Sequence, residues 1–205
     1  MSPVGRRRVV LATRNRHKVE EIRRILADVG LPGIELSSMV DLPDPPDVAE
    51  TGLTFAENAV LKASSVAAAA GLPAVADDSG LSVDALGGMP GVLSARWAGR
   101  HGDDMANLAL VLDQLADVPD RLRTARFVCA AALALPDGTV TVETGLVPGR
   151  LAREPRGSNG FGYDPIFVPD GETRTTAELP SSEKDAISHR GRAFRALAAH
   201  LRKLP

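Results

Sequence analysis

Two adjacent carboxylates, Asp77 and Asp78, directly follow the apolar stretch Ala74-Val75-Ala76. A buried carboxylate without a partner is costly, so a metal ion or a network of donors is expected to face them. Mg²⁺ prefers oxygen ligands and is usually held by one or two carboxylates together with substrate phosphates. If the apolar stretch is a strand, neighbouring side chains point to opposite faces, and one of the two carboxylates would contact the metal. The alternative is a capped turn at the end of the strand.

Glu50 begins a second polar segment, E-T-G-L-T-F-A-E-N. Thr54 and Glu57 have the spacing of a capping box, which accounts for Glu57 as part of a helix start. Glu50 precedes that helix and has no such explanation, so it is a candidate second metal ligand. Asn58 and Lys62 are four residues apart and share one helix face, which belongs either to the site or to a solvated surface.

The polar run Thr13-Arg14-Asn15-Arg16-His17-Lys18 lies where a predicted strand passes into a helix. Free backbone N–H groups at a helix start attract phosphate, and Thr13, Asn15 and Lys18 can add donors and a positive charge. The chain has no G-x-x-x-x-G-K-[ST] sequence, so this run is not a Walker loop. A helix cap with solvated basic side chains is the alternative.

The segment G-S-N-G-F-G-Y-D-P, residues 157–165, is rich in glycine, which lets backbone approach a ligand closely. Phe161 could stack on a base, and Asp164 could accept a hydrogen bond from a ring N–H or a sugar. A tight loop with one side chain in the core is the alternative.

Further along, Ser188 resembles a helix N-cap and is followed by His189 and Arg190. Cations are unfavourable at that end of the helix dipole, which hints at a ligand that compensates them. Surface charge is the alternative.

These polar segments lie at the ends of alternating strands and helices. Such an order, with one hairpin, predicts an α/β fold with a mixed sheet. We expect one domain over residues 1–205, with residues 1–8 as a flexible tail. The expected strands are 9–12, 74–76, 127–135 and 139–144, and the expected helices follow Asn15, Thr54, Asp103 and Ser188.

Composition excludes several classes of protein. The 205 residues are 44% hydrophobic and 24% charged, which is typical of a soluble globular chain. The net charge of −2 and the 3% aromatic content argue against a nucleic-acid-binding surface. No apolar run is long enough to span a membrane. The single cysteine, Cys129, cannot form an internal disulfide, and we expect a reducing, cytoplasmic location.

Taken together, the motifs resemble those of the ITPase/XTPase family, the non-canonical purine nucleoside triphosphate pyrophosphatases. The resemblance extends from about Val9 to Leu201, with the motifs in order. It rests on T-R-N-R-H-K, E-T-G-L-T-F-x-E-N-A-x-x-K-A, A-D-D-S-G-L, P-G-V-L-S-A-R, G-F-G-Y-D-P-I-F and E-K-x-A-I-S-H-R-G-R-A.

The resemblance implies a long twisted mixed sheet in two lobes with a nucleotide cleft, and hydrolysis of ITP, dITP and XTP to the monophosphate and pyrophosphate with Mg²⁺. It implies a homodimer, with Asp78 as general base and metal ligand, whereas Glu50 is a candidate second ligand from its position before the helix. A Maf-like pyrimidine nucleoside triphosphate pyrophosphatase and a non-catalytic nucleotide-binding protein are the alternatives. The implied substrate contacts are Thr13, Arg14, Asn15, Arg16, His17, Lys18, Ser79, Phe161, Gly162, Tyr163, Asp164, Lys184, His189 and Arg190, with Lys62 and Asp77 as further candidates.

Overall fold

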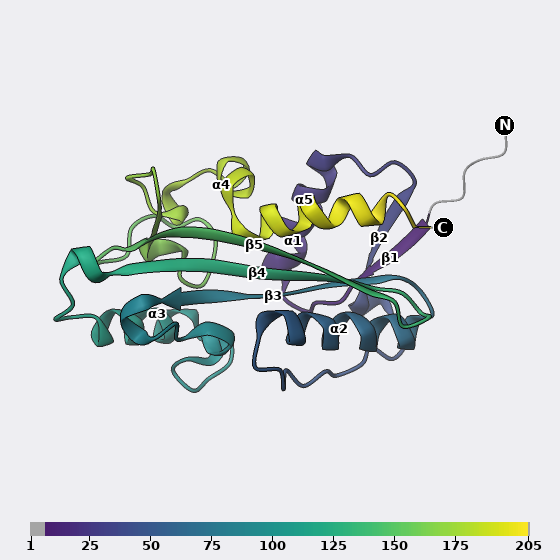
Figure 1. Cartoon of the computed structure of the whole chain (residues 1–205), viewed down its shortest axis with the longest axis horizontal. Coiled ribbons are helices and arrows are strands. Elements are labelled where there is room, and N and C mark those ends of the chain that lie inside the picture. The colour runs from purple at the N-terminus through teal and green to yellow at the C-terminus, as the bar shows by residue number, and fades with distance from the viewer. Residues whose placement is uncertain (1–6, 205) are drawn as a thin grey trace. The chain divides into compact units, whose positions relative to one another are not determined.

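The computed structural model describes residues 7–204 and contains a six-stranded sheet in the order β2-β1-β3-β4-β5-β6 (Figure 1). β1 pairs in parallel with β2 and β3, whereas β5 and β6 are antiparallel, so the predicted mixed α/β sheet is confirmed. The strands are β1 Arg7–Leu11, β2 Ile34–Ser38, β3 Ala74–Val83, β4 Thr124–Ala134, β5 Val140–Leu151 and β6 Phe167–Pro169. The α-helices are α1 Arg16–Val29, α2 Phe55–Ala70, α3 Asp104–Gln114, α4 Ser181–Ile187 and α5 His189–Leu201.

The chain divides into two compact units. The first comprises the described residues up to Asp78, the segment Cys129–Gly145 and the residues from Arg190 onward. The second comprises Ser79–Val128 and Leu146–His189. That residues 1–205 form one domain stays a prediction.

In the first unit, helices cover both faces of the sheet. Val9, Leu11 and Val75 pack with α1 and α5, whereas Val10 and Ala76 pack with α2. Figure 1 shows α1 and α5 on one side of the strands and α2 on the other. The alternation follows from the two-residue period of a strand, and it decides which helix each residue of β3 faces.

Local sequence signals begin the helices of the first unit as predicted. The Asn15 side chain accepts a hydrogen bond from the Lys18 backbone N–H and caps α1. Thr54 and Glu57 form both hydrogen bonds of the capping box at the start of α2. Gly71 ends α2 in the left-handed conformation, which glycine adopts without steric cost.

The second unit has its own apolar core around α3, whose N-cap is Asp103 as predicted. Phe127 from β4 packs against Phe167 from β6 with ring centroids 4.4 Å apart. The Tyr163 ring is buried in this core, and its hydroxyl donates to the Ser94 carbonyl at 2.9 Å. The glycine-rich loop is therefore anchored to the core by one aromatic side chain.

The structure differs from expectation in several places, and strands β2 and β6 were not predicted. β3 runs through the two carboxylates to Val83, where a turn after Ala76 was an alternative, because cations on both faces of the strand partner the acids. Arg7 and Arg8 pair with β2 and so belong to a strand, whereas the rest of the predicted tail, residues 1–6, lies outside the described residues. The short helix α4 was not predicted, and it carries Lys184.

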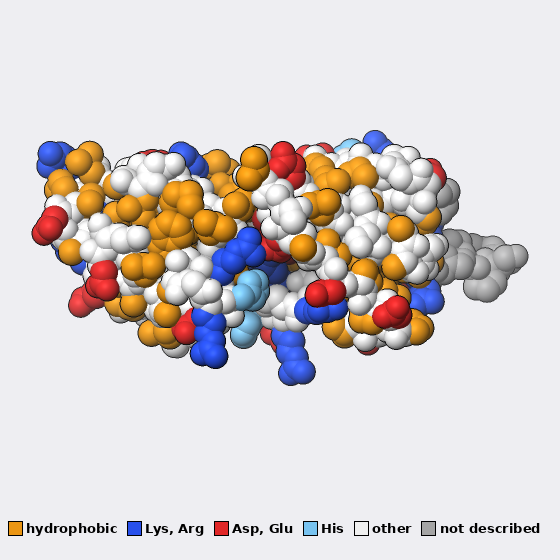
Figure 2. Space-filling view, turned by 90° about the horizontal axis from the view of Figure 1, so that it is seen from below, with side chains coloured by type: hydrophobic (Ala, Val, Ile, Leu, Met, Phe, Trp, Pro, Cys, Tyr) orange, Lys and Arg blue, Asp and Glu red, His pale blue; other side chains and the backbone are white. Residues whose placement is uncertain are grey.

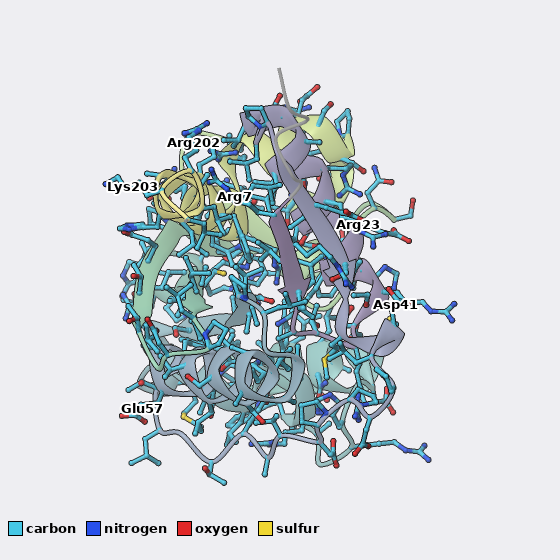
Figure 3. All side chains as sticks on the ribbon, turned by 90° about the vertical axis from the view of Figure 1, so that its right-hand side faces the viewer. Arg7, Arg23, Asp41, Glu57, Arg202 and Lys203 are labelled. Atoms are coloured by element: carbon cyan, nitrogen blue, oxygen red, sulfur yellow. The ribbon has the colours of Figure 1, made fainter. Side chains whose placement is uncertain are left out.

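The surface is mixed in charge. The face in Figure 2 shows acidic and basic side chains scattered among apolar ones, which agrees with the small net charge. In the first unit, Arg23 and Glu57 project outward from α1 and α2, and Lys203 follows α5 (Figure 3). None of the helices within residues 7–204 is both long and apolar enough to cross a bilayer.

Candidate active site

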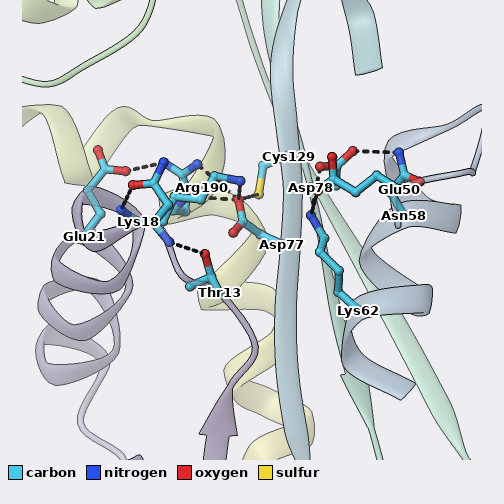
Figure 4. A network of polar contacts seen from close by, with 11 residues as sticks. Thr13, Lys18, Glu21, Glu50, Asn58, Lys62, Asp77, Asp78, Cys129 and Arg190 are labelled. Carbon is cyan, nitrogen blue, oxygen red and sulfur yellow. Dashed lines mark hydrogen bonds and ion pairs between the residues drawn. The ribbon is translucent and has the colours of Figure 1, made fainter. Parts of the chain in front are cut away.

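β3 directs its two carboxylates to opposite faces of the sheet (Figure 4). Asp77 has the parity of Val75 and faces α1 and α5, whereas Asp78 has the parity of Ala76 and faces α2. Both side chains are buried, so each must be compensated by separate partners. The adjacent acids therefore form two different sites.

On the α2 side, Asp78 accepts hydrogen bonds from two residues one helical turn apart. Asn58 Nδ2 donates to Asp78 Oδ2 at 3.2 Å, and Lys62 Nζ donates to Asp78 Oδ1 at 3.0 Å. Lys62 Nζ also lies 2.7 Å from Glu50 Oε1. The face of α2 with Asn58 and Lys62 is thus part of this site, and its alternative as a solvated surface is wrong. We call Glu50, Asn58, Lys62 and Asp78 the α2-side site.

The electrostatics of the α2-side site favour a basic carboxylate. Burial raises the pKa of Asp78, and the positive charge of Lys62 offsets only part of that effect, since the negative charge of Glu50 lies nearby. Burial by itself would lower the pKa of Lys62, but Asp78, Asp77 and Glu50 together raise it above the usual value. Lys62 is therefore an ammonium, and Asp78 holds a proton more readily than an exposed aspartate does.

On the other face, Asp77 belongs to a buried ionic network. Asp77 Oδ2 lies 3.1 Å from Lys18 Nζ, 3.2 Å from Arg190 Nε and 3.1 Å from Arg190 Nη2. Arg190 Nη1 in turn donates to Glu21, and the Cys129 thiol lies 3.9 Å from Asp77 Oδ2. These contacts join β3 to α1 and α5.

Asp77 and Cys129 are both buried, but the pKa of Asp77 is lowered and that of Cys129 is raised. Burial alone would raise the pKa of Asp77, but the charges of Lys18 and Arg190 outweigh it and hold that pKa far below its usual range. Burial raises the pKa of the Cys129 thiol well above its usual value, with a further contribution from Asp77. Asp77 is a permanent anion that fixes two cations, and Cys129 is a neutral core residue.

The α2-side site suits a hard divalent cation. Within residues 7–204, no group of three or more His, Cys, Asp or Glu side chains is assembled as a metal cage. Glu50 and Asp78 nevertheless converge on a single positively charged atom, Lys62 Nζ. Two carboxylates with the remaining positions left to water and phosphate is the usual donor set for Mg²⁺.

The structure gives the residues of the segment 13–18 several roles. Thr13 Oγ1 accepts a hydrogen bond from the Asn15 backbone, so both residues shape the helix start. Arg14 pairs with Asp47 at 3.0 Å on the surface, and Arg16 and His17 are exposed. Of this run, Lys18 is the side chain that reaches β3. Their contacts with substrate stay predictions.

In the second unit, Asp164 organises the glycine-rich loop. One carboxylate oxygen accepts from the Phe161 backbone at 2.9 Å and from Lys184 Nζ at 2.6 Å. The other accepts from Thr176 Oγ1 at 2.8 Å. Lys184 Nζ also lies 5.3 Å from the centre of the Phe161 ring, within the range of a cation–π contact. Asp164 thus positions Lys184 and Phe161.

Other predicted substrate residues of this unit lie among protein partners. The Gly162 N–H donates to Asp104 at 2.9 Å, and the His189 ring is stacked on Phe127 with centroids 4.7 Å apart and planes 12° apart. Ser79 is half-buried in β3. Arg190, predicted to bind substrate, has Asp77 and Glu21 as partners. Substrate contact by these side chains stays a prediction.

Sequence reasoning missed three residues that hold the predicted ones in place: Glu21, Asp104 and Thr176. Glu21 lies three residues after Lys18, which places both on one face of α1. That spacing was the one signal available, since Glu21 lies 169 residues from its partner Arg190. Nothing local marks Asp104 or Thr176.

A profile of the Ham1 family matches residues 9–200. The chain belongs to the Ham1 family. This confirms the resemblance to the ITPase/XTPase family that the motifs indicated.

Among Ham1-family relatives, the chain is 62% identical to a protein named dITP/XTP pyrophosphatase from Streptomyces coelicolor, over 96% of this chain and 98% of that one. A HAM1 protein from Coxiella burnetii has a similar structure, with a TM-score of 0.85, 42% identity, and coverage of 97% of this chain and 100% of that one. A crystal structure named nucleoside-triphosphatase, dITP/XTP pyrophosphatase, from Mycobacterium abscessus has a TM-score of 0.76, 55% identity, and coverage of 95% and 98%. The Ham1 fold accordingly covers nearly the whole chain.

Proposed function

We propose that the protein hydrolyses the non-canonical purine nucleoside triphosphates ITP, dITP and XTP to the monophosphate and pyrophosphate, with Mg²⁺, and so removes them from the nucleotide pool. The observation that carries the proposal is the α2-side site, in which a carboxylate with a raised pKa shares a cation with a second carboxylate. Support comes from relatives of 55–62% identity that are named dITP/XTP pyrophosphatases.

The proposed chemistry is attack of water on the α-phosphorus. Asp78 takes a proton from the water, the water oxygen bonds to the α-phosphorus, and the bond to the pyrophosphate oxygen breaks. Asn58 fixes the Asp78 carboxylate during this step through its hydrogen bond at 3.2 Å. Mg²⁺, when bound, would be held by Asp78 and Glu50 and would neutralise phosphate charge and lower the pKa of bound water. No protein nucleophile is needed, because pyrophosphate is a good leaving group.

The protein's own cations complement the charge of the phosphates. Lys62 and Lys18 come from different helices and are each only partly exposed, at 14% and 15% of the side chain. In such surroundings an ammonium interacts more strongly with phosphate than it does in bulk water. We assign both to phosphate binding, and Phe161, Lys184 and His189 to the purine and its ribose.

Pyrophosphate release tests the proposal. The purified protein is incubated with Mg²⁺ and ITP, dITP, XTP, ATP, GTP, dTTP or UTP, and pyrophosphate is measured. We expect kcat/KM for ITP and XTP to exceed that for ATP and GTP by at least about 100-fold, since a site built on hydrogen bonds to an oxygen can reject an amino group strongly. Preference for dTTP or UTP would favour the Maf-like alternative, and no release from any nucleotide would favour a binding protein.

Asp78→Asn tests the general base. Loss of a general base costs about 10²–10⁴-fold in rate, and we expect kcat to fall by that factor. Asp28→Asn makes the same chemical change on the exposed side of α1 and should leave kcat unchanged. An Asp78→Asn protein with near-normal kcat would show that Asp78 is not the base.

Glu50→Gln tests the second metal ligand. Activity should vanish with a chelator and return with added Mg²⁺, and Glu50→Gln should raise the Mg²⁺ concentration needed for half-maximal rate. An unchanged Mg²⁺ dependence would leave Glu50 as a partner of Lys62 alone.

The assembly and location follow from the same proposal. We propose a homodimer in the cytoplasm, acting on a small-molecule nucleotide without nucleic acid. Mass measured in solution by light scattering tests the dimer, and a monomer at micromolar concentration would contradict it.

A further inference from the structure

Lys62 occupies the position between the two proposed metal ligands. Its Nζ lies 2.7 Å from Glu50 Oε1 and 3.0 Å from Asp78 Oδ1. Figure 4 shows the side chain rising from α2 towards Asp78. The oxygen atoms that would bind a divalent cation therefore already bind an ammonium group.

Two carboxylates that share one cation repel each other when the cation is removed. Glu50 and Asp78 are 24% and 8% exposed, so water screens that repulsion only in part. The Lys62 ammonium belongs to the same chain, so it relieves this repulsion without the loss of translational entropy that a free ion would incur on binding. Lys62 and both acids together keep one net negative charge, which still attracts a divalent cation.

A lysine side chain is suited to exchange. Its ammonium is a compact charge on a flexible four-carbon stem, unlike the planar fork of arginine that locks a carboxylate in two parallel bonds. The two faces of β3 differ in this respect, although Arg190 directs both of its nitrogens to one oxygen, Asp77 Oδ2. Arg190 binds Asp77 through two nitrogens in full burial, whereas Lys62 binds Asp78 through one nitrogen at a partly exposed position.

We propose that Lys62 is an exchangeable counter-ion. Without ligand it holds Glu50 and Asp78 together, and when the metal and nucleotide enter it leaves the carboxylates to the metal and binds the substrate phosphates. This inference rests on the proposed function, because it takes Glu50 and Asp78 as the metal ligands. It adds that the metal competes with a residue of the site itself.

The alternative is a fixed tie, in which Lys62 stays on the carboxylates and pre-orders them for the metal. The two ideas predict opposite results when the ammonium is removed. Under exchange, the metal binds more tightly, because two charge-assisted hydrogen bonds no longer have to be broken. Under a fixed tie, the metal binds more weakly, because the two carboxylates separate.

The experiment is a titration of the full chain with Mn²⁺ alone, without nucleotide, in which electron paramagnetic resonance measures free Mn²⁺. Lys62→Met keeps the stem and removes the charge, and we expect its Mn²⁺ Kd to be lower than that of the wild type by about tenfold or more. Lys203→Met is the matched control, since Lys203 is exposed beyond α5 (Figure 3) and the substitution removes the same charge. Its Kd should stay within about twofold of the wild type, because salt screens distant exposed charges.

Two further variants keep the test decisive. Lys62→Gln retains a neutral donor and serves if Lys62→Met folds poorly without metal; it should also bind Mn²⁺ more tightly than the wild type. Adding Glu50→Gln to Lys62→Met should abolish the gain, which shows that the metal occupies this site. In thermal melts, Mn²⁺ should raise the Tm of Lys62→Met more than that of the wild type.

An Mn²⁺ affinity in Lys62→Met that is equal to or weaker than in the wild type would overturn the proposal, as would the absence of measurable binding in both. This outcome is separable from failure of the proposed function. The titration contains no nucleotide, whereas the proposed function fails when the wild type releases no pyrophosphate from ITP, dITP or XTP.

Discussion

Asp77→Asn and Asp78→Asn make the same chemical change at neighbouring residues, and the structure predicts opposite effects on stability. Asp77 is a buried anion whose charge is favoured by Lys18 and Arg190, as its strongly lowered pKa shows. Removing one partner of a buried ion pair typically costs about 3–5 kcal/mol, because the remaining charge is left uncompensated. The neutral amide of asparagine keeps the shape and some hydrogen bonding, so we take the lower value of about 3 kcal/mol.

That loss corresponds to a fall in Tm of about 6–12 °C for a chain of this size. Asp78 differs, because its pKa is raised and its charge is therefore a cost to the folded state. Asp78→Asn should leave Tm unchanged or slightly higher while lowering kcat by about 10²–10⁴-fold.

Thermal unfolding followed by circular dichroism, together with urea unfolding, measures both variants. Asp77→Asn is expected to melt well below the wild type, and Asp78→Asn is not. An Asp77→Asn protein within about 2 °C of the wild type would refute the assignment of Asp77 to the ionic network. Equal destabilisation by the two substitutions would refute the division of roles between the faces of β3.

Three more outcomes follow from the structure. In Gly160→Ala, the new Cβ would collide with the Asp164 carboxylate, and the backbone there has a positive φ of 76°, so KM for dITP should rise about tenfold or more. The control is Gly171→Ala, which has a similar φ but open space around the new Cβ and should leave KM unchanged; equal effects of the two substitutions would refute the steric argument. Phe127→Leu removes the ring stacked on His189 and should lower kcat/KM for dITP by about 2–10-fold, the usual range for an aromatic pair; an unchanged kcat/KM would show that the stack does not position His189. Burial raises the pKa of Cys129 in the folded state, so the unfolded chain loses this proton first as pH rises. The free energy of unfolding measured with urea should therefore keep the full contribution of Cys129 below about pH 8.5 and decline above it, and Cys129→Ala should weaken that decline.

The sequence predicted those parts of the fold that depend on neighbouring residues. Asn15 and the Thr54–Glu57 capping box mark helix starts because their partners lie three residues away. The apolar run before Asp77 marks a strand, and the two-residue period predicts that the carboxylates diverge. The candidate residues on α2 were likewise found from a spacing of four.

The sequence did not predict features that depend on distant partners. The sequence predicted a strand end at Ala76 because acids rarely continue a buried strand, and the strand continues because Lys18 and Arg190 pair with Asp77 and Lys62 pairs with Asp78. Of these cations, Arg190 lies 113 residues from its partner. Because Asp77 and Arg190 are so far apart in the sequence, their pairing was not predicted either, and the motifs predicted that Arg190 binds substrate. The partners of Asp164 within the protein, Lys184 and Thr176, lie 20 and 12 residues away and were not predicted, and its contact with a ligand stays a prediction.

Hydrolysis of dITP by the wild type in ¹⁸O-labelled water tests most directly the claim that the α2-side site directs water to the α-phosphorus. The products of a single turnover with Mg²⁺ are separated, and their masses are measured by mass spectrometry. We expect deoxyinosine monophosphate that carries one ¹⁸O atom, together with unlabelled pyrophosphate. Label in pyrophosphate, or release of orthophosphate and a nucleoside diphosphate, would contradict it.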